Sequence, residues 1–413
     1  EVVDFIIHST EEILKEEFTT SLSDKNVHIL DPFAGTGTFI SRILQSKIIN
    51  KENLAQKYKY ELHSNEIILL ACYIASINIE SVYAEVSGEE KYEPFNGMVL
   101  TDTFQLYEQE KDLIANLLPD NSQKRTKQKE KKIKVIIGNP PYSAQQKSAN
   151  DNAANVKYSN LDERILQTYL SESKATLNNA LYDSYIRAFR WATDRIEDEG
   201  VIAYVTNAGW IENLSTSGFR RSLEEEFSKV YIFHLRGNQR TKGERSRKEG
   251  GKIFGSGSRS PIAISILVKK KNFKEKGEIF LCDIGDYLSR EEKLTKIKNI
   301  KSIGGIKKLN LFTKINPDIE HDWINQTDKS FSKHTLIGGK LSKDNESLFS
   351  KYSLGVSTNC DSWLYNSSKQ KLRNNINKLV NFYNSEVDRY RNYAGNMSIE
   401  KFVDTNPSKI SWH

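Results

Sequence analysis

The alternation of short apolar runs with longer amphipathic runs in the first half of the chain limits the possible folds most strongly. Segments with helical periodicity separate stretches of strand length: the apolar runs 27–30, 97–100, 134–138 and 201–206, and residues 57–64, in which polar and apolar residues alternate. The helical segment over residues 180–200 is expected to end at Gly200. Strand, helix and strand in succession are typical of βαβ units, which build a parallel sheet between two helical layers. We therefore predict an α/β fold with a mostly parallel sheet and helices on both faces.

The pattern changes after residue 229. Residues 230–235 and 261–270 are apolar runs with no helical segment between them, which predicts an antiparallel pair at the sheet edge. Beyond Lys270 the chain becomes richer in Lys and Asn, and its periodicity weakens. Because 413 residues are too many for one ordinary core, we predict two domains.

Composition narrows the possible partners. The net charge of +6 is small, so a nucleic-acid partner has to be sought in local basic clusters. The longest apolar run, Ile67–Ile79, is too short to span a bilayer, so we expect no membrane partner. The three cysteines lie far apart without a Cys-x-x-Cys pair, and the histidines lack ligand spacing. We therefore expect no metal site, and reduced thiols in a cytoplasm.

A glycine-containing turn follows the first predicted strand. The segment Ile29–Phe39, ILDPFAGTGTF, contains a strand end, a turn and a helix start. Gly35 and Gly37 allow the backbone to turn sharply and a ligand to approach it. Parallel sheets bind ligands beyond the carboxyl ends of their strands, where Asp31 is expected to lie. A phosphate loop is excluded because Gly-Lys-Ser/Thr is absent. A purely structural turn is the alternative.

Acidic residues also end the next two predicted strands. Glu66 is placed to accept hydrogen bonds from the two ribose hydroxyls of a nucleoside. Asp102 is placed to accept from an adenine amino group, while the ring of Phe104 packs on the base. Each acid taken singly is more often a helix N-cap. Three acids at three successive strand ends favour a nucleoside-containing ligand.

The segment VIIGNPPYS, residues 135–143, ends a buried strand at two prolines. Pro141 disfavours a helical conformation at Pro140, which leaves the Pro140 carbonyl free to face a substrate beside the side-chain carbonyl of Asn139. These two acceptors match the two hydrogens of one planar amino group. Accepting both shifts the nitrogen toward tetrahedral geometry as it attacks, a stabilisation that grows in the transition state. Tyr142 offers a flat face for stacking.

The segments DPFAGTGTF, NEI, TDTF and NPPY, in this order, resemble those of gamma-class adenine-specific DNA methyltransferases that use S-adenosylmethionine. The wider resemblance, over most of the chain, is to the methyltransferase and partial target-recognition region of Type ISP restriction-modification enzymes. It implies a class I methyltransferase fold with a seven-stranded, mostly parallel sheet. With it we expect a methyltransferase domain over residues 1–300, a linker over 301–339 and the start of a C-terminal target-recognition domain over 340–413.

The resemblance also implies a role for each motif residue. The cofactor S-adenosylmethionine would contact Asp31, Phe33, Gly35, Gly37, Glu66, Ile67, Asp102 and Phe104. The catalytic residues would be Asn139, Pro140 and Tyr142, with the target base stacked between Tyr142 and Phe254. No metal and no covalent enzyme intermediate are needed. The chain begins at Glu1, after the Thr-Pro segment usual in the family, so we expect a piece of a longer polypeptide with nuclease and motor modules.

A basic segment precedes Phe254. Residues 236–252 hold seven Lys and Arg residues, opposed only by Glu244 and Glu249. An adenine in duplex DNA has to be flipped out to reach an enzyme pocket, and a basic surface is needed to hold the phosphates. A solvated face is the alternative. We interpret the segment as a DNA-facing loop in which the phosphate contacts are made by Arg236, Arg240, Lys242, Arg245 and Arg247.

The Asn-rich residues 143–160 are expected to order over the flipped base or the DNA strand, with a plain loop as the alternative. Three other functions remain open. Protein glutamine methyltransferases act on a different planar amide with the same kind of residues, and methylation of the cytosine 4-amino group needs a similar motif. The third is a catalytically idle DNA-recognition module, against which the intact Asp31, Glu66, Asp102 and Asn139 argue.

Overall fold

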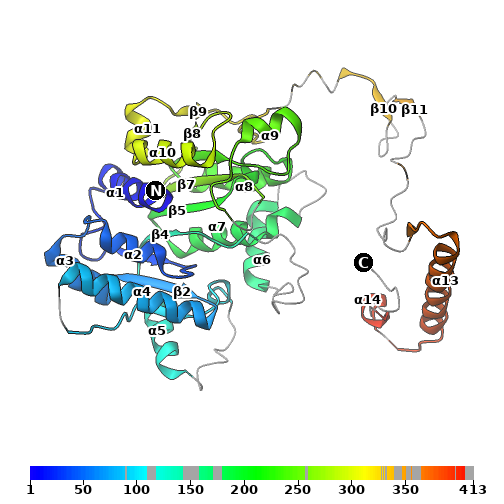
Figure 1. Ribbon diagram of the computed structural model, residues 1–413, viewed down its shortest axis with the longest axis horizontal. Helices are drawn as coiled ribbons and strands as arrows, with labels where there is room; N and C mark the ends of the chain where they lie inside the picture. The colour runs from blue at the N-terminus through cyan, green and yellow to red at the C-terminus, as the bar shows by residue number, and fades with distance from the viewer. Residues whose placement is uncertain are drawn as a thin grey trace. The chain divides into compact units, whose positions relative to one another are not determined.

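The computed structural model divides the chain into two units, Glu1–Thr327 and Asp328–His413. It describes residues 1–88, 91–108, 118–142, 158–170, 179–255, 259–326, 328, 330, 333–338, 347–349, 355, 364–395 and 397–404. The ribbon of both units is shown in Figure 1. The first unit contains the expected α/β fold, and the candidate site residues all lie in it.

A nine-stranded sheet forms the centre of the first unit, in the order β3-β2-β1-β4-β5-β7-β6-β8-β9. Its strands are β1 (His28–Asp31), β2 (Leu62–Glu66), β3 (Met98–Leu100), β4 (Ile133–Gly138), β5 (Gly200–Asn207), β6 (Lys229–Arg236), β7 (Ile262–Lys269), β8 (Glu278–Asp283) and β9 (Thr313–Ile315). Strands β1 to β5 are parallel, and β7 is antiparallel to both β5 and β6. The mostly parallel sheet is thereby confirmed. Beyond the seven expected strands, β8 pairs parallel with β6, and β9 pairs antiparallel with β8.

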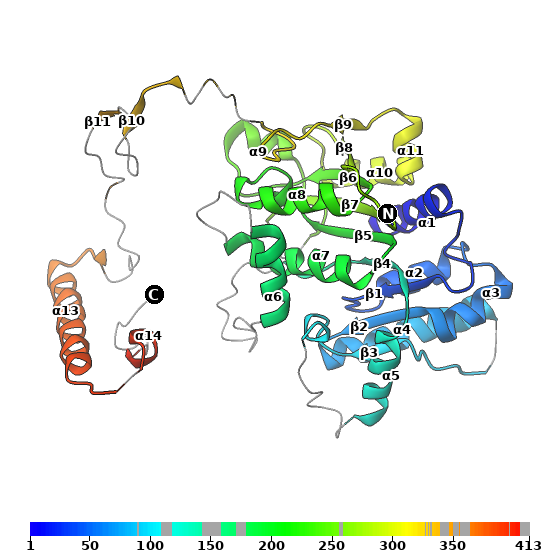
Figure 2. The same cartoon turned by 180° about the vertical axis from the view of Figure 1, so that it is seen from behind.

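Helical layers cover both faces of the sheet, as predicted (Figures 1 and 2). Alternate residues of each strand enter two different cores: Ile29 of β1 faces one, and Leu30 faces the other. The first core is covered by α1 (Val2–Phe18), α2 (Thr38–Gln45), α3 (Lys51–Gln56), α4 (Leu69–Ser87), α10 (Arg290–Ile300) and α11 (Ile303–Lys308). The second core is covered by α6 (Ser159–Ile165), α7 (Ser184–Arg195) and α8 (Ser217–Glu226). The helices α5 (Pro119–Lys129) and α9 (Gly243–Glu249) lie outside both cores.

Two local predictions were wrong. Residues 57–61, predicted as the start of a strand, form a π-helical turn before β2. This turn is stabilised by a buried ion pair between Lys57 and Glu61, whose charged atoms are 2.8 Å apart, and Lys57 Nζ also donates to the Val27 carbonyl (2.8 Å). The helix expected to end at Gly200 ends at Arg195 instead. Gly200 is the first residue of β5, so it begins a strand and does not cap the helix.

Helix α4 has a wide apolar face, but most of that face is exposed. It continues the apolar run 67–79 to Ser87, and by length and composition alone it could cross a membrane. Only Ala75, Ile79 and Tyr83 of this helix are buried, and all three belong to the first core. Seven large apolar side chains at its beginning are between 39% and 69% exposed: Ile67, Ile68, Leu69, Leu70, Tyr73, Ile74 and Ile77. Helix α4 therefore belongs to the layer over the sheet, with its outer side in contact with solvent.

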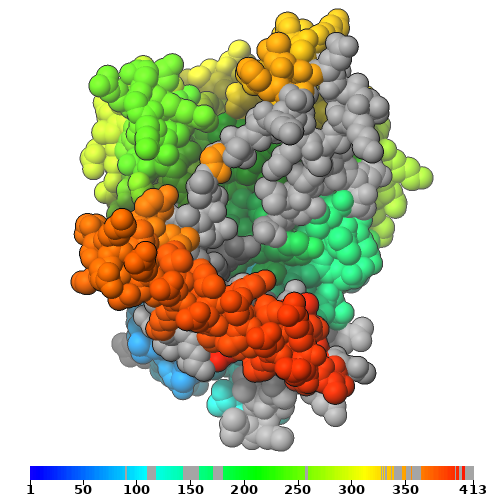
Figure 3. All heavy atoms as spheres, turned by 90° about the vertical axis from the view of Figure 1, so that its right-hand side faces the viewer, coloured from blue at the N-terminus to red at the C-terminus, as the bar shows by residue number. Residues whose placement is uncertain are grey.

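The long connection between β6 and β7 contains α9 and projects at the surface (bright green in Figure 3). We call residues 236–255 the basic loop. Its helix α9 buries no residue. By contrast, Ile253 near the end of the loop belongs to the first core and is only 3% exposed. The loop is therefore exposed in its middle and anchored at its end.

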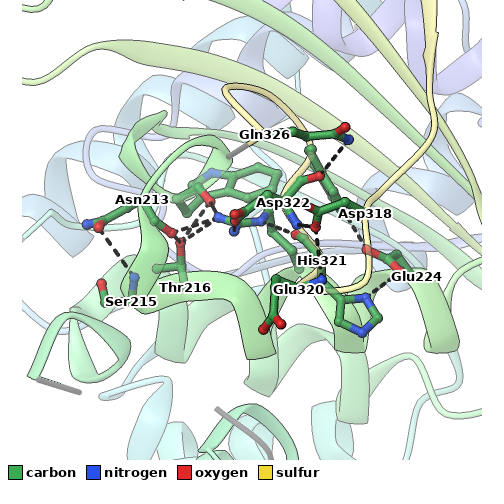
Figure 4. Close-up of polar contacts among 12 residues, drawn as sticks. Asn213, Ser215, Thr216, Glu224, Asp318, Glu320, His321, Asp322 and Gln326 are labelled. Atoms are coloured by element: carbon green, nitrogen blue, oxygen red, sulfur yellow. Dashed lines mark hydrogen bonds and ion pairs between the residues drawn. The ribbon is translucent and has the colours of Figure 1, made fainter. Parts of the chain in front are cut away.

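The segment that ends the first unit, with Asp318, His321 and Asp322, lies near Glu224 of α8 (Figure 4). Arg220 of α8 holds this segment. Its guanidinium is buried, donates to the His321 carbonyl (2.7 Å) and forms an ion pair with Asp322. Glu224, one turn later, accepts from the indole N–H of Trp323 (2.8 Å) and contacts His321 Nδ1 (2.8 Å). These contacts, together with α11 and β9, place much of the expected linker 301–339 within the first unit.

The described part of the second unit contains a two-stranded parallel sheet and two helices. The strands are β10 (Leu336–Gly338) and β11 (Ser347–Phe349), and the helices are α13 (Lys369–Arg391) and α14 (Ile399–Phe402). Ser368 caps α13 by accepting from the Lys371 amide (3.3 Å). Near the other end of α13, Arg389 lies 4.1 Å from the ring centre of Phe402 on α14. A cation–π contact thus joins these two helices.

Candidate active site

The carboxyl ends of the parallel strands bring the motif residues to one edge of the sheet. Asp31 ends β1, Glu66 ends β2, and Asn139 directly follows β4. Strand β1 lies between β2 and β4, so these three ends are neighbours. The strand order reverses between β1 and β4, and such a switch point opens a crevice for a ligand. Asp102 follows β3, one strand further out.

The three acids share one local hydrogen bond. Each carboxylate accepts from the backbone amide two residues later: Phe33 for Asp31 (3.1 Å), Ile68 for Glu66 (2.8 Å) and Phe104 for Asp102 (2.9 Å). This is the turn chemistry by which acidic side chains commonly begin a helix or turn. The N-cap alternative is wrong as stated, because the N-caps of the following helices are Gly37, Ile68 and Thr103, and the acids stabilise the turns that precede them. The three acids differ in the partner of their second carboxylate oxygen.

The second oxygen of Asp31 is buried and lacks a protein partner. Asp31 is 0% exposed, and its Oδ2 has no hydrogen-bond partner among the residues that the structure describes. Burial raises the pKa of this carboxyl to about 7, and the charge of Glu66 adds to the rise. A buried carboxylate oxygen without a partner is unfavourable unless a donor or cation reaches it. The site therefore fits the ammonium group of an amino-acid ligand.

Glu66 joins the turn after β1 to the start of α4. Its Oε2 accepts from the Gly35 amide (2.8 Å), so one carboxylate holds two segments. Gly35 and Gly37 have φ values of 54° and 81°, in the left-handed region that favours glycine. Each carboxylate oxygen keeps a second lone pair, which leaves Glu66 able to accept from ligand hydroxyls. Ile67, beside Glu66, is 62% exposed and offers an apolar surface next to it.

The second carboxylate oxygen of Asp102 accepts a hydrogen bond from a tyrosine that the motifs did not indicate. The hydroxyl of Tyr158 donates to Asp102 Oδ2 (2.8 Å), and burial together with this carboxylate raises the pKa of Tyr158. The ring of Phe104 lies between those of Tyr158 and Phe33, with centres 5.2 Å and 5.5 Å apart. Phe104 is 5% exposed and Phe33 is half-buried, so Phe33 is the more accessible of these two candidate rings.

Asn139 is exposed at the end of β4, and its side-chain oxygen is oriented by Tyr142. The Tyr142 hydroxyl donates to Asn139 Oδ1 (2.6 Å) and lies 3.0 Å from the Val205 carbonyl of β5. Burial raises the pKa of Tyr142, so its proton stays in place. An amide oxygen has two lone pairs, and one of them remains for a substrate. Pro140 beside it is buried.

Comparisons with known proteins identify the family of the chain. Residues 56–240 match the Eco57I restriction-modification methylase family, and residues 347–413 match the Type ISP C-terminal specificity domain. The chain carries the methylase and specificity domains of the Type ISP restriction-modification enzymes. A comparison with curated proteins gives no match.

Three solved structures are similar to this Type ISP methylase over nearly its whole length. A nuclease-deletion mutant of the Type ISP enzyme LlaGI with a DNA substrate mimic is 44% identical with a TM-score of 0.87, and the match covers 100% of this chain and 34% of that chain. The ATP-dependent Type ISP enzyme LlaBIII bound to DNA is 42% identical with a TM-score of 0.86, over 93% and 26%. The DrdV–DNA complex is 34% identical with a TM-score of 0.85, over 100% and 41%. The chain thus spans less than half the length of each of these relatives.

Within the basic loop, Arg236 differs from the other arginines in its contacts. Arg236 forms ion pairs with Asp283 (2.7 Å) and Asp286. Although burial raises the pKa of Asp283, hydrogen bonds from His234 and Arg236 lower it below its usual value. Arg245 and Arg247 make only long contacts to Glu212 (3.4 Å) and Glu244 (3.5 Å), with side chains 65% and 79% exposed. Arg240 and Lys242 are exposed as well. The contacts of Arg236 are those of a structural ion-pair cluster, so the other four remain the candidate DNA contacts.

Phe254 is half-buried and packs against the first core, which Tyr142 also contacts. The two candidate stacking rings of the Type ISP methylase therefore border the same core. Most of the Asn-rich segment predicted to cover the base, residues 143–157, lies outside the described residues. The cavity of about 970 Å³ among α1, α2, α10 and α11 contains none of the candidate site residues, so it is separate from this site.

Sequence reasoning missed Tyr204 of β5. In the sheet, Tyr204 lies opposite Gly138, and its hydroxyl is buried with no partner within the described part of the chain. A Cβ atom on Gly138 would lie 2.9 Å from Asp31 Oδ1 and 3.7 Å from the ring of Tyr204. Glycine is thus needed where β4 passes between Asp31 and Tyr204. The signal was a single tyrosine in the otherwise aliphatic run 201–206.

Proposed function

We propose that the chain transfers a methyl group from S-adenosylmethionine to the 6-amino group of an adenine flipped out of duplex DNA. It would act in the cytoplasm as the modification module of a restriction-modification enzyme. The observation that carries the proposal is the close approach of β1 and β4. Gly138, the residue before Asn139, lies directly against Asp31, so a ligand on Asp31 and a base on Asn139 occupy adjacent places.

The residues present fit the cofactor. Asp31 Oδ2 would accept from the ammonium group of its methionine part, and the turn at Gly35 and Gly37 would lie along it. Glu66 would accept from the ribose hydroxyls, while Asp102 and the apolar Phe33, Ile67 and Phe104 would surround the adenine. When bound, S-adenosylmethionine supplies an electrophilic methyl group on a sulfonium.

The end of β4 supplies the acceptors for the target. Asn139 Oδ1 and the Pro140 carbonyl would accept the two hydrogens of the adenine amino group. As the amino nitrogen became tetrahedral, these two acceptors would hold its hydrogens and direct its lone pair toward the methyl group that the bound cofactor would supply. The Tyr142 hydroxyl holds Asn139 Oδ1 in place, and the Tyr142 ring and Phe254 would contact the faces of the base. Holding both reactants in this geometry lowers the barrier without a covalent enzyme intermediate.

Duplex DNA is the proposed partner. The similar structures of LlaGI, LlaBIII and DrdV were determined with DNA or a DNA mimic. An adenine inside a duplex is inaccessible, so it has to be flipped into the pocket. The exposed Arg240, Lys242, Arg245 and Arg247 of the basic loop would contact phosphates. We further propose that nuclease and motor modules belong to the same longer polypeptide.

Methyl transfer from tritiated S-adenosylmethionine tests the proposal. The chain would be incubated with unmethylated plasmid DNA, with free nucleotides and with a protein extract, and the labelled DNA would be digested to nucleosides. Label in N6-methyl-2′-deoxyadenosine is expected. Label in N4-methylcytosine would favour the cytosine reaction, and label in protein alone would favour a glutamine methyltransferase. Cofactor binding without transfer to any of these would favour an idle recognition module.

A further inference from the structure

The end of the basic loop lies directly on the backbone that leads into α10. The Gly251 amide donates to the Leu288 carbonyl (2.9 Å). A Cβ atom on Gly250 would lie 2.1 Å from that same oxygen, and one on Gly251 would lie 2.4 Å from the Arg290 nitrogen. Real Cβ atoms do not approach backbone so closely, so both positions require glycine. The loop therefore touches this segment backbone to backbone.

A buried lysine completes the attachment. Lys293 on α10 is 0% exposed, and its Nζ donates to the carbonyls of Glu249 (2.7 Å) and Gly251 (2.8 Å). Arg290, one turn earlier, donates from Nε to the Ile253 carbonyl (3.0 Å). Lysine is almost never fully buried, and a buried ammonium group is unfavourable unless it is hydrogen-bonded. These two side chains of α10 therefore make three hydrogen bonds to the end of the basic loop.

The residue that follows this attachment is Phe254, a proposed stacking ring. Ile253 is buried in the first core, and its carbonyl, which Arg290 holds, belongs to the peptide that joins it to Phe254. The start of the loop is attached to the same segment, because Arg236 pairs with Asp283 and Asp286 just before α10. Both ends of the loop are therefore fixed by residues 283–293, and its exposed middle carries the basic side chains.

We infer that Lys293 and Arg290 are positioning residues for the target nucleotide. They hold the end of the basic loop so that Phe254 meets the flipped base while the loop's basic side chains meet its phosphates. This inference rests on the proposed function. Neither residue reaches the strand ends where transfer occurs, so both act through the loop.

The substitution Lys293→Met tests this, with Lys296→Met as the matched control. Lys296 lies on the same helix, but its Nζ donates to the Ile284 carbonyl (2.7 Å), outside the loop. Methylation of unmethylated plasmid DNA gives the KM for DNA, and calorimetry gives the Kd for S-adenosylmethionine. In Lys293→Met the KM for DNA should rise about tenfold, the effect of one or two hydrogen bonds. Its cofactor Kd should stay within about twofold of the wild type, as should both constants of Lys296→Met.

Arg290→Met keeps the test decisive if Lys293→Met fails to fold, because the Arg290 side chain is exposed. It should raise the KM for DNA about threefold, since one hydrogen bond is lost. An unchanged KM for DNA in Arg290→Met, or an equal rise in Lys296→Met, would overturn the inference. A folded Lys293→Met chain with only a lowered Tm would do the same. A wild-type chain that binds the cofactor but methylates no DNA would instead overturn the proposed function.

Discussion

The proposed cofactor half of the site (Asp31, Glu66 and Asp102) and the proposed target half (Asn139, Tyr142 and Phe254) are stabilised by contacts that span very different distances in the sequence. In the cofactor half, each of Asp31, Glu66 and Asp102 accepts from an amide two residues further on. In the target half, Lys293 holds the carbonyls of Glu249 and Gly251, and Phe254 follows them. The cofactor half therefore forms largely from its own turns. The target half depends on packing between distant segments, so distant substitutions should affect DNA before they affect the cofactor.

The largest effect is expected for Asn139→Ala, which should lower kcat without changing cofactor binding. In Asn139→Ala the acceptor for the target amine is lost, and kcat should fall about 10²- to 10³-fold, as for the loss of one group that stabilises a transition state. Cofactor binding measured by calorimetry should be unchanged. Asn207→Ala is the control, because Asn207 also ends a neighbouring strand but only accepts from the Gly209 amide (2.9 Å). Lost cofactor binding in Asn139→Ala would show that the halves are not separate.

Glu66→Ala should give the opposite result. The variant loses the acceptors for ribose as well as the bonds to the Gly35 and Ile68 amides. Hydrogen bonds to a charged group are strong, so the cofactor Kd should rise about 100-fold, with a smaller change in kcat at saturating cofactor. Glu80→Ala is the control, since Glu80 on α4 accepts from the Phe95 amide (2.9 Å) away from the strand ends. An equal effect of both substitutions would indicate a general loss of structure.

Asp31 should make the cofactor half sensitive to pH. Its pKa is raised from 3.8 to about 7, so between these values the folded chain binds a proton that the unfolded chain releases. The stability from this proton is fully present below pH 3.8 and is lost as the pH rises through 7. Binding of the ammonium group needs the ionised carboxylate, so the Kd should rise about tenfold per pH unit below the pKa.

Calorimetry at pH values from about 5 to about 8 measures how the cofactor Kd changes with pH on both sides of the Asp31 pKa. Asp31→Asn should bind the cofactor weakly, without this pH dependence. Its Tm relative to the wild type should increase as the pH rises through 7, because the wild type alone buries the charge there. Parallel profiles for the two proteins would contradict the assigned role.

The smallest effects are expected within the basic loop. Replacing Arg245 or Arg247 by Glu should weaken DNA binding and lower the slope of log K against log salt by about 1 for each lost phosphate contact. Arg236→Gln should leave that slope unchanged and lower the Tm, because the ion pairs of Arg236 with Asp283 and Asp286 are lost. Binding of plasmid fragments at several salt concentrations measures the slope. If the salt slope changed more for Arg236→Gln than for the Arg245 variant, Arg236 would be the DNA contact and Arg245 would not.

Sequence alone could predict the fold class and the places of Asp31, Glu66 and Asp102 at or just after strand ends, because these depend on strand alternation and local turns. Sequence could not predict the contact between Tyr158 and Asp102, because these residues are 56 positions apart. Nor could it separate Arg236 from the other arginines, since Asp283 and Asp286 meet it only through the pairing of β6 with β8. The strand β8 itself was overlooked because it lies in a Lys-rich region where the hydrophobic periodicity is weak. Hydropathy predicted an apolar face on α4 but not its exposure.

That exposed face of α4 makes the stability of the chain dependent on its surroundings. Apolar surface in water contributes about 25 cal/mol per Å² when it is covered, and ligands of the native state alone raise the free energy of unfolding. Any apolar molecule that coats Leu70, Tyr73 and Ile77 should therefore raise the melting temperature. Mild detergents should reduce aggregation in concentrated solutions. A melting temperature measured without detergent should therefore be lower than the melting temperature of the chain with the face of α4 covered.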